Sequence, residues 1–260
     1  MTPETIAHLA ETLENAELNA AAVAQISLAH PGITEADGYA IQHEIRRRKQ
    51  ARGARIVGFK AGLTSRAKMR QVGVENPSYG FLADYFALPD GGEAEHARLI
   101  HPRVEPEIAF VLKKPLKGPG CHIGAVLAAT EFVMPALEII DSRYQNFKFD
   151  FPSVVADNSS SARFVLGGRA KPAEDLDLRT LGLVMEHNGK PFSFGAGAAV
   201  LGHPALAVAL VVNLLARRDE GLEAGALILT GGVTEAVACR PGDHVNLRMQ
   251  ELGSVSVRFG

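Results

Sequence analysis

The chain reads Arg-Val-Glu-Pro-Glu-Ile-Ala-Phe-Val-Leu over residues 103–112. The run from Ile108 to Leu112 is apolar on both faces of an extended chain, as expected where a strand enters a core. Glu105 and Glu107 stand two positions apart, so they would project from the same face of that strand. The stretch predicts a strand that brings two carboxylates together, with a solvated strand end as the alternative.

Similar short runs, separated by Gly and Pro, fill the chain on both sides of this stretch. Strand and helix do not alternate regularly, so a doubly wound parallel sheet fits poorly and an α+β fold on a mixed β core fits better. Asn188-Gly189 predicts a type I′ hairpin turn. We expect strands at residues 56–61, 107–112, 132–140, 183–187, 227–229, 245–249 and 254–259, and helices at 65–72, 123–129 and 204–217.

Residues 1–54 differ in composition from the remainder: they are rich in Ala, Glu and Arg, with apolar residues at helical spacing. Thr2 and Thr34 are predicted helix N-caps, and the second helix should run to about Arg52. We therefore expect an N-terminal helical segment at 1–54 and a β-rich catalytic domain at 55–260.

Composition excludes several classes of protein. The balance of 47% hydrophobic and 22% charged residues is that of a globular protein. A net charge of −2 gives no overall positive potential that would attract nucleic acid or an anionic membrane. The basic run at 46–49 is interpreted as a solvated helix face or a complement to the helix dipole. No stretch is expected to reach the roughly 20 apolar residues of a membrane helix. Cys121 and Cys239 are far apart, and two free thiols fit a cytoplasmic protein.

A third carboxylate, Glu138, lies in the apolar stretch Val-Met-Pro-Ala-Leu-Glu-Ile-Ile. An ionised side chain there is costly unless it is paired or binds a cation. A salt bridge to Arg143 or Arg163 is one explanation. Three carboxylates with no neighbouring cluster of His or Cys instead describe a site for magnesium, with manganese as the alternative. Such a cation leaves coordination positions open for a chelating 2-oxo acid.

Two further segments carry polar groups beside apolar residues. Lys60, flanked by Gly58 and Gly62, is either an exposed strand lysine or a group that binds a substrate carboxylate or transfers a proton. The polar run of Asp157, Asn158, Ser159, Ser160 and Ser161 is explained by turn chemistry, with a carboxylate-binding loop as the alternative. The Gly-rich pieces lack a nucleotide-binding fingerprint.

Together these pieces resemble the hydratase/decarboxylase branch of the fumarylacetoacetate hydrolase superfamily, over almost the whole chain. The resemblance rests on five motifs in order: Gly58-Phe-Lys-Ala-Gly-Leu-Thr-Ser, Val104-Glu-Pro-Glu-Ile-Ala-Phe, Pro135-Ala-Leu-Glu-Ile-Ile-Asp-Ser-Arg, Ala156-Asp-Asn-Ser-Ser-Ser and Gly197-Ala-Ala-Val-Leu-Gly-His-Pro-Ala. It implies a mixed β-sandwich or roll with N-terminal helices packed beside it. It also implies that Glu105, Glu107 and Glu138 hold the metal and that Lys60 is catalytic.

The resemblance implies a metal-dependent carboxy-lyase that acts on a small 2-oxo-dicarboxylate, (3E)-2-oxohex-3-enedioate, in the meta-cleavage catabolism of aromatics. Ser159, Ser160 and Ser161 are the candidate substrate contacts. A homo-oligomer is expected, with a complex with the pathway hydratase left open. The hydratases of the branch typically have Pro-Asp-x-Gly where this chain has Pro77-Ser-Tyr-Gly. A hydratase, or a catalytically silent partner scaffold, remains the alternative.

Overall fold

The computed structural model describes residues 1–65 and 77–260 of the chain. Three helices come first and strands dominate the remainder. In chain order the main elements are α1 (Pro3–Leu18), α2 (Ile26–Ala29), α3 (Glu35–Ala51), β1 (Ile56–Gly62), β2 (Ser78–Ala83), β3 (Ala87–Leu88), β4 (Glu93–Ala94), β5 (Arg103–Leu112), α5 (Ile123–Ala129), β6 (Thr130–Ile140), α6 (Phe151–Ala156), β7 (Ser161–Leu166), β8 (Gly182–His187), β9 (Lys190–Ala196), α7 (Pro204–Ala216), β10 (Leu227–Leu229), β11 (Val237–Ala238), β12 (His244–Met249) and β13 (Gly253–Phe259).

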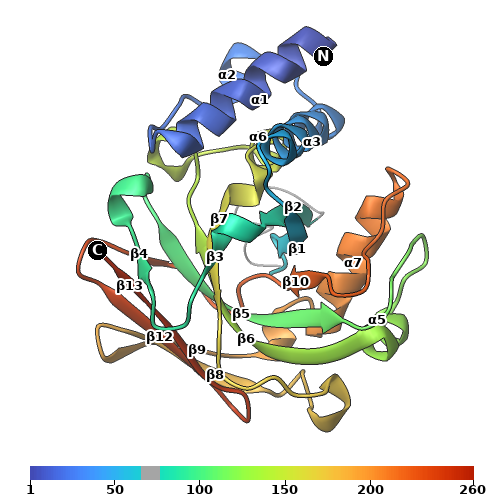
Figure 1. The fold of residues 1–260 in the computed structure, drawn as a ribbon, viewed down its shortest axis with the longest axis vertical. Coiled ribbons are helices and arrows are strands. Elements are labelled where there is room, and N and C mark those ends of the chain that lie inside the picture. The colour runs from blue at the N-terminus through green and yellow to red at the C-terminus, as the bar shows by residue number, and fades with distance from the viewer. Residues whose placement is uncertain (66–76) are drawn as a thin grey trace.

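Within the described residues, the strands form two mixed sheets (Figure 1). The larger has eight strands, in the order β2-β1-β10-β5-β6-β7-β3, with β11 beside β5. The smaller has five, in the order β4-β13-β12-β8-β9. Strands β12 and β13 contact β6, so the two sheets enclose apolar side chains between them. The expected α+β fold on a mixed β-sandwich or roll is confirmed.

Every strand expected from the sequence is present. The turn between β8 and β9 has positive φ at both Asn188 (53°) and Gly189 (75°), which is the type I′ geometry predicted for this pair. Strand β2 was missed, because its sequence Ser-Tyr-Gly-Phe-Leu-Ala is buried on both faces and shows no alternation. Apart from Ser65, the helix expected at 65–72 lies outside the described residues.

Helix α7 corrects the expectation that no stretch of the chain is long and apolar enough for a membrane helix. The segment Gly197–Ala216 spans 20 residues with a hydropathy of 2.0, so by length and composition alone it could cross a membrane. In the structure α7 packs against β1, β2 and α5, and most of its side chains are buried. The contacts with these elements explain why the helix is apolar on nearly all sides.

Both predicted N-caps are present. The hydroxyl of Thr2 accepts a hydrogen bond from the backbone N–H of Thr5, and Thr34 forms a capping box with Asp37. Helix α3 lies against α1 on one side and α6 on the other. Division of the chain into separate units at residue 54 stays a prediction.

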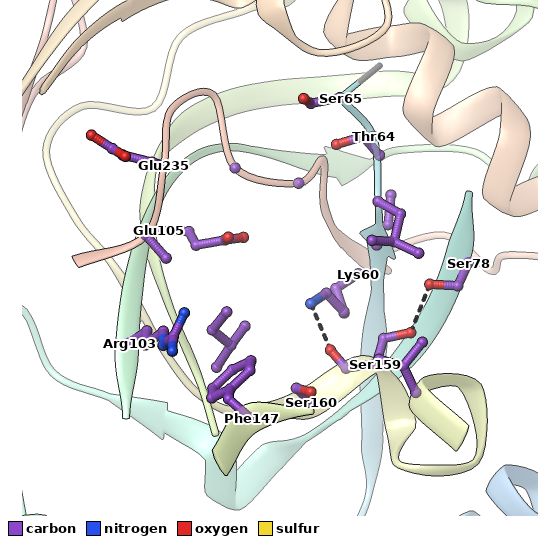
Figure 2. Close-up of a pocket in the computed structure, with 18 of the residues that line it drawn as sticks. Lys60, Thr64, Ser65, Ser78, Arg103, Glu105, Phe147, Ser159, Ser160 and Glu235 are labelled. Carbon is purple, nitrogen blue, oxygen red and sulfur yellow. Dashed lines mark hydrogen bonds between the residues drawn. The ribbon is translucent and has the colours of Figure 1, made fainter. Parts of the chain in front are cut away.

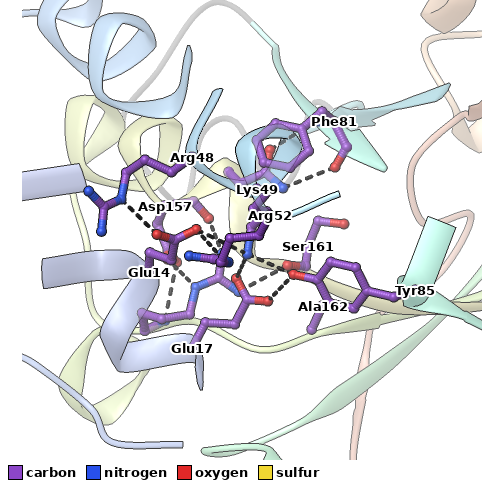
Figure 3. A network of polar contacts seen from close by, with 12 residues as sticks. Glu14, Glu17, Arg48, Lys49, Arg52, Phe81, Tyr85, Asp157, Ser161 and Ala162 are labelled. Carbon is purple, nitrogen blue, oxygen red and sulfur yellow. Dashed lines mark hydrogen bonds and ion pairs between the residues drawn. The ribbon is translucent and has the colours of Figure 1, made fainter. Parts of the chain in front are cut away.

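The basic run in α3 is only partly the solvated face expected from the sequence: Arg47 is exposed, whereas Lys49 is buried (Figure 3). Lys49 is only 1% exposed; its Nζ lies 2.7 Å from Glu17 Oε2 and donates to the hydroxyl of Tyr85, also at 2.7 Å. Arg48 Nε lies 2.7 Å from Glu14 Oε2, and Glu14 is fully buried. Because burying these charges without partners would be costly, the network fixes how α1 lies on α3.

Candidate metal centre and active site

Strands β5 and β6 place the three predicted ligands together. Glu105 pairs directly with Glu138 across the antiparallel ladder, and Glu107 follows two residues later on the same face of β5. The three are 7%, 0% and 0% exposed. One carboxylate oxygen from each can be chosen so that all three lie within 4.8 Å of one another.

Within the described residues, the carboxylates of Glu107 and Glu138 are incompletely satisfied. Glu107 Oε2 accepts a hydrogen bond of 2.7 Å from the N–H of Gly231, and Lys60 Nζ lies 2.8 Å from Glu138 Oε2. The other oxygens, Glu107 Oε1 and Glu138 Oε1, are buried with no hydrogen-bond partner in the described part of the chain. Burial, followed by the neighbouring charge of Glu138, raises the pKa of Glu107 well above its usual range.

This arrangement fits a divalent cation. Unpartnered carboxylate oxygens in a buried position are costly, and a hard cation that prefers oxygen ligands would remove that cost. Glu138 does not pair with either arginine that the sequence offered as an explanation: its cationic neighbour is Lys60, while Arg143 forms its ion pair with Asp157.

Lys60 lies on β1 and is only 3% exposed, so the interpretation as an ordinary surface lysine was wrong. Its Nζ also donates to the carbonyl oxygen of Ser159 at 3.1 Å. Burial alone would lower the pKa of this ammonium group, but Glu138 and the two other glutamates raise it above its ordinary value. The structure therefore places a charged donor beside the carboxylate cluster.

The serine run forms a buried turn between α6 and β7. Asn158, Ser159 and Ser160 all have left-handed backbone, with φ of 51°, 50° and 58°, a conformation that non-glycine residues rarely adopt. The side chain of Asn158 holds the turn against β2: it accepts from Phe81 N at 2.8 Å and donates to Phe81 O at 3.0 Å. The Oγ atoms of Ser159 and Ser78 lie 2.9 Å apart.

Lys60, Glu105 and the serine turn border a cavity of about 960 Å³ (Figure 2). Ser78, Ser159 and Ser160 line it, whereas Ser161 is not among the lining residues. The sequence interpretation missed several others, from loops and from the start of β5. The principal lining residues are Lys60, Leu63, Thr64, Ser65, Ser78, Arg103, Glu105, Ile140, Phe147, Lys148, Phe149, Val154, Ser159, Ser160, Gly231, Val233, Thr234 and Glu235.

Gly231 shows how tightly the loop after β10 fits here. Its φ of +91° is disfavoured for other residues, and a Cβ at this position would lie 2.0 Å from Thr64 Oγ1. Only glycine therefore lets the backbone N–H reach Glu107. The run Thr230-Gly-Gly-Val, to which the sequence interpretation assigned no nucleotide site, contributes to the carboxylate cluster instead.

Comparison with known proteins agrees with this geometry. Residues 68–259 match the family model described as the C-terminal part of fumarylacetoacetate hydrolase. The chain belongs to the fumarylacetoacetate hydrolase family. It is 60% identical over 256 residues to a 4-oxalocrotonate decarboxylase of Pseudomonas putida, covering 98% of this chain and 97% of that protein. It is 41% identical over 260 residues to the 2-oxo-hept-4-ene-1,7-dioate hydratase of Escherichia coli, covering 96% of each.

The family resemblance extends to the whole structure. A solved 4-oxalocrotonate decarboxylase from Pseudomonas putida, complexed with magnesium and adipate, superposes with a TM-score of 0.98. The two are 58% identical, and the match covers 100% of this chain and 99% of that one. The family assignment and the expected fold are thus confirmed, while the role of each site residue stays a prediction.

Proposed function

We propose that this chain is a magnesium-dependent 4-oxalocrotonate decarboxylase that converts (3E)-2-oxohex-3-enedioate to 2-hydroxypenta-2,4-dienoate and carbon dioxide. The observation that carries the proposal is the buried cluster of Glu105, Glu107 and Glu138, with Lys60 beside it, at a cavity large enough for a small diacid. The full-length similarity to decarboxylases of that name, one of them solved with magnesium, supports it.

The three glutamates would hold magnesium, with manganese as the alternative. The bound cation supplies a Lewis acid for the keto oxygen of the substrate. Its open coordination positions suit the 2-oxo acid end of the molecule. The substrate's distal carboxylate then lies further along the cavity.

The substrate contains its own electron sink. The bond between the departing carboxylate and its neighbouring carbon breaks, and the electron pair moves through the double bond toward the keto oxygen. Proton uptake on that oxygen gives the dienol. The Lys60 ammonium, which lies beside Glu138, would donate a hydrogen bond, or a proton, where this negative charge develops. Ser159 and Ser160 are the nearby candidates for carboxylate contacts, whereas Ser161 could take part only after movement of its side chain into the cavity.

The cavity walls are partly apolar. Apolar side chains stand between the polar groups, which lowers the local dielectric and strengthens the charge interactions within. They come from strand β6, helix α6 and three loops: Leu63, Ile140, Phe147, Phe149, Val154 and Val233.

The test is turnover of (3E)-2-oxohex-3-enedioate by purified protein, with carbon dioxide release and dienol absorbance followed together. With magnesium, both should rise in step; after chelation of the metal, neither should. If the protein releases no carbon dioxide from this substrate but removes the absorbance of 2-hydroxypenta-2,4-dienoate supplied in its place, it is instead a hydratase. If neither reaction occurs, the protein is a catalytically silent scaffold.

Ser78 bears on the hydratase alternative. It is fully buried at the start of β2 and lines the cavity. The hydratases of the branch typically have an aspartate here. An acid at this position could activate water, which decarboxylation does not require.

We expect Ser78→Ala to retain most of the decarboxylation rate, because carbon dioxide loss needs only an electron sink. Ser78→Asp should be slower, roughly 10-fold or more, since a buried carboxylate would repel the dianionic substrate. Initial rates at saturating magnesium measure both. A large loss in Ser78→Ala with normal thermal unfolding would give the hydroxyl, which contacts Ser159, a direct role.

We infer that the protein works in the cytoplasm as a homo-oligomer, and we keep a complex with the pathway hydratase as a second proposal. Free Cys121 and Cys239 are compatible with a reducing compartment. The edge strand β9 exposes Phe192 and Phe194, 38% and 70% accessible, which is compatible with contact between subunits. Light scattering of the protein alone, and then mixed with the hydratase, tests both.

A further inference from the structure

Arg103 enters the cavity from the same strand face as the metal cluster. It stands two residues before Glu105 on β5, so the two side chains project in one direction about 6.6 Å apart along the strand. Figure 2 shows Arg103 beside Phe147 on one side of the cavity, with Glu105 above them and Lys60 on the opposite side. A ligand chelated at the carboxylate cluster could therefore reach the arginine with its other end.

The guanidinium group of Arg103 has no acidic partner among the residues that the structure describes. Within the described part of the chain it lies against the ring of Phe147, whose centroid is 4.2 Å from Arg103 Cζ. The contact with the ring holds the guanidinium group in place, and its N–H groups suit a planar anion such as a carboxylate. A half-buried, unpaired arginine in a cavity is a typical carboxylate receptor.

We propose that Arg103, held against Phe147, binds the distal carboxylate of the substrate and makes the site selective for diacids over 2-oxo monoacids. This inference rests on the proposed function, because the 2-oxo acid end must be anchored at Glu105, Glu107 and Glu138. A six-carbon diacid is long enough to reach from that cluster to Arg103. Binding there would also orient the bond that breaks.

Two other cations line the same cavity. Lys60 is already engaged by Glu138 and the carbonyl oxygen of Ser159, so it belongs to the anchored end of the ligand. Lys148 follows Phe147 on the loop after β6 and offers a single ammonium without the planar fork of arginine. The proposal assigns the distal carboxylate to Arg103 and not to Lys148.

The test compares two ligands that differ only at the distal end, 2-oxohexanedioate and 2-oxohexanoate. Both carry the chelating 2-oxo acid, and neither has the double bond needed for carbon dioxide loss. In calorimetric titrations with magnesium present, the parent protein should bind the diacid roughly 10- to 100-fold more tightly, as expected for a charged hydrogen-bonded pair. Arg103→Met should remove this preference and leave the affinity for 2-oxohexanoate within about 2-fold.

Arg98→Met is the matched control, because Arg98 is an exposed arginine outside the cavity and should keep the preference. The proposal would be overturned if Arg103→Met still preferred the diacid over the monoacid. Loss of that preference in Lys148→Met would then assign the distal carboxylate to Lys148. If Arg103 serves only to pack Phe147, the variant should unfold at a lower temperature and still discriminate. Metal-dependent binding of the monoacid without any diacid preference would overturn this inference alone, whereas no metal-dependent binding of either ligand would overturn the proposed function too.

Discussion

Glu138→Gln should lower decarboxylation by roughly 100-fold or more and weaken magnesium binding in parallel, while leaving the fold intact. The substitution removes one of three anionic ligands and preserves side-chain volume. Glu138 is fully buried, and its pairing with Glu105 across the ladder depends on the backbone, which the change does not alter. Magnesium titrations of both activity and binding heat measure the two effects together.

The same strand supplies a control for this variant. Glu131 lies near the start of β6 with its side chain exposed, so Glu131→Gln makes an identical chemical change away from the cluster. It should behave like the parent protein. If Glu138→Gln kept both its activity and its magnesium dependence, Glu138 would have to be removed from the proposed ligand set.

The carboxylate cluster was largely predictable, because it depends on local rules. Alternation of side chains along a strand puts Glu105 and Glu107 on one face, and the apolar context of Glu138 indicates an unusual buried acid. The same alternation places Arg103 on that face, so the sequence of residues 103–112 could have identified Arg103 as a candidate site residue. Only the ladder, in which Glu105 lies opposite Glu138, required the structure.

The remaining features depend on contacts between segments far apart in sequence. The left-handed turn at 158–160 is stable because Asn158 pairs with the backbone of Phe81, and nothing in the local sequence announces that partner. The sequence placed Lys49 on a solvated helix face. Its ammonium group is buried instead, because the carboxylate of Glu17 and the hydroxyl of Tyr85 offset the free-energy cost of removing it from water. Patterns within one segment cannot predict such partners.

Arg143 illustrates the same limit near the active site. The sequence offered it as a partner of Glu138, but its guanidinium contacts Asp157 and donates to the carbonyl oxygens of Asp141 and Ser161 at 2.8 and 2.9 Å. These bonds tie the end of β6 to the serine turn. Arg143 therefore supports the cavity wall without entering the carboxylate cluster.

Lys60→Met should abolish most turnover, again by roughly 100-fold or more, but its effect on the metal should be opposite to that of Glu138→Gln. Methionine keeps much of the length of the lysine side chain and removes its charge. Since Lys60 Nζ lies 2.8 Å from Glu138 Oε2, the ammonium group competes with a cation for the same carboxylates. Its removal should leave magnesium affinity unchanged or increase it.

Stability provides a second measurement of the same competition. Without magnesium, Lys60→Met removes the ammonium group that pairs with the buried Glu138, so its thermal unfolding midpoint should lie below that of the parent protein. Added magnesium binds the folded state and should raise the midpoint of the variant by more than it raises that of the parent. Lys171→Met, at a half-exposed lysine paired with Glu251, should show neither change. If magnesium affinity fell together with turnover in Lys60→Met, the lysine would be needed to build the metal site, and a separate role for it toward the substrate would have to be abandoned.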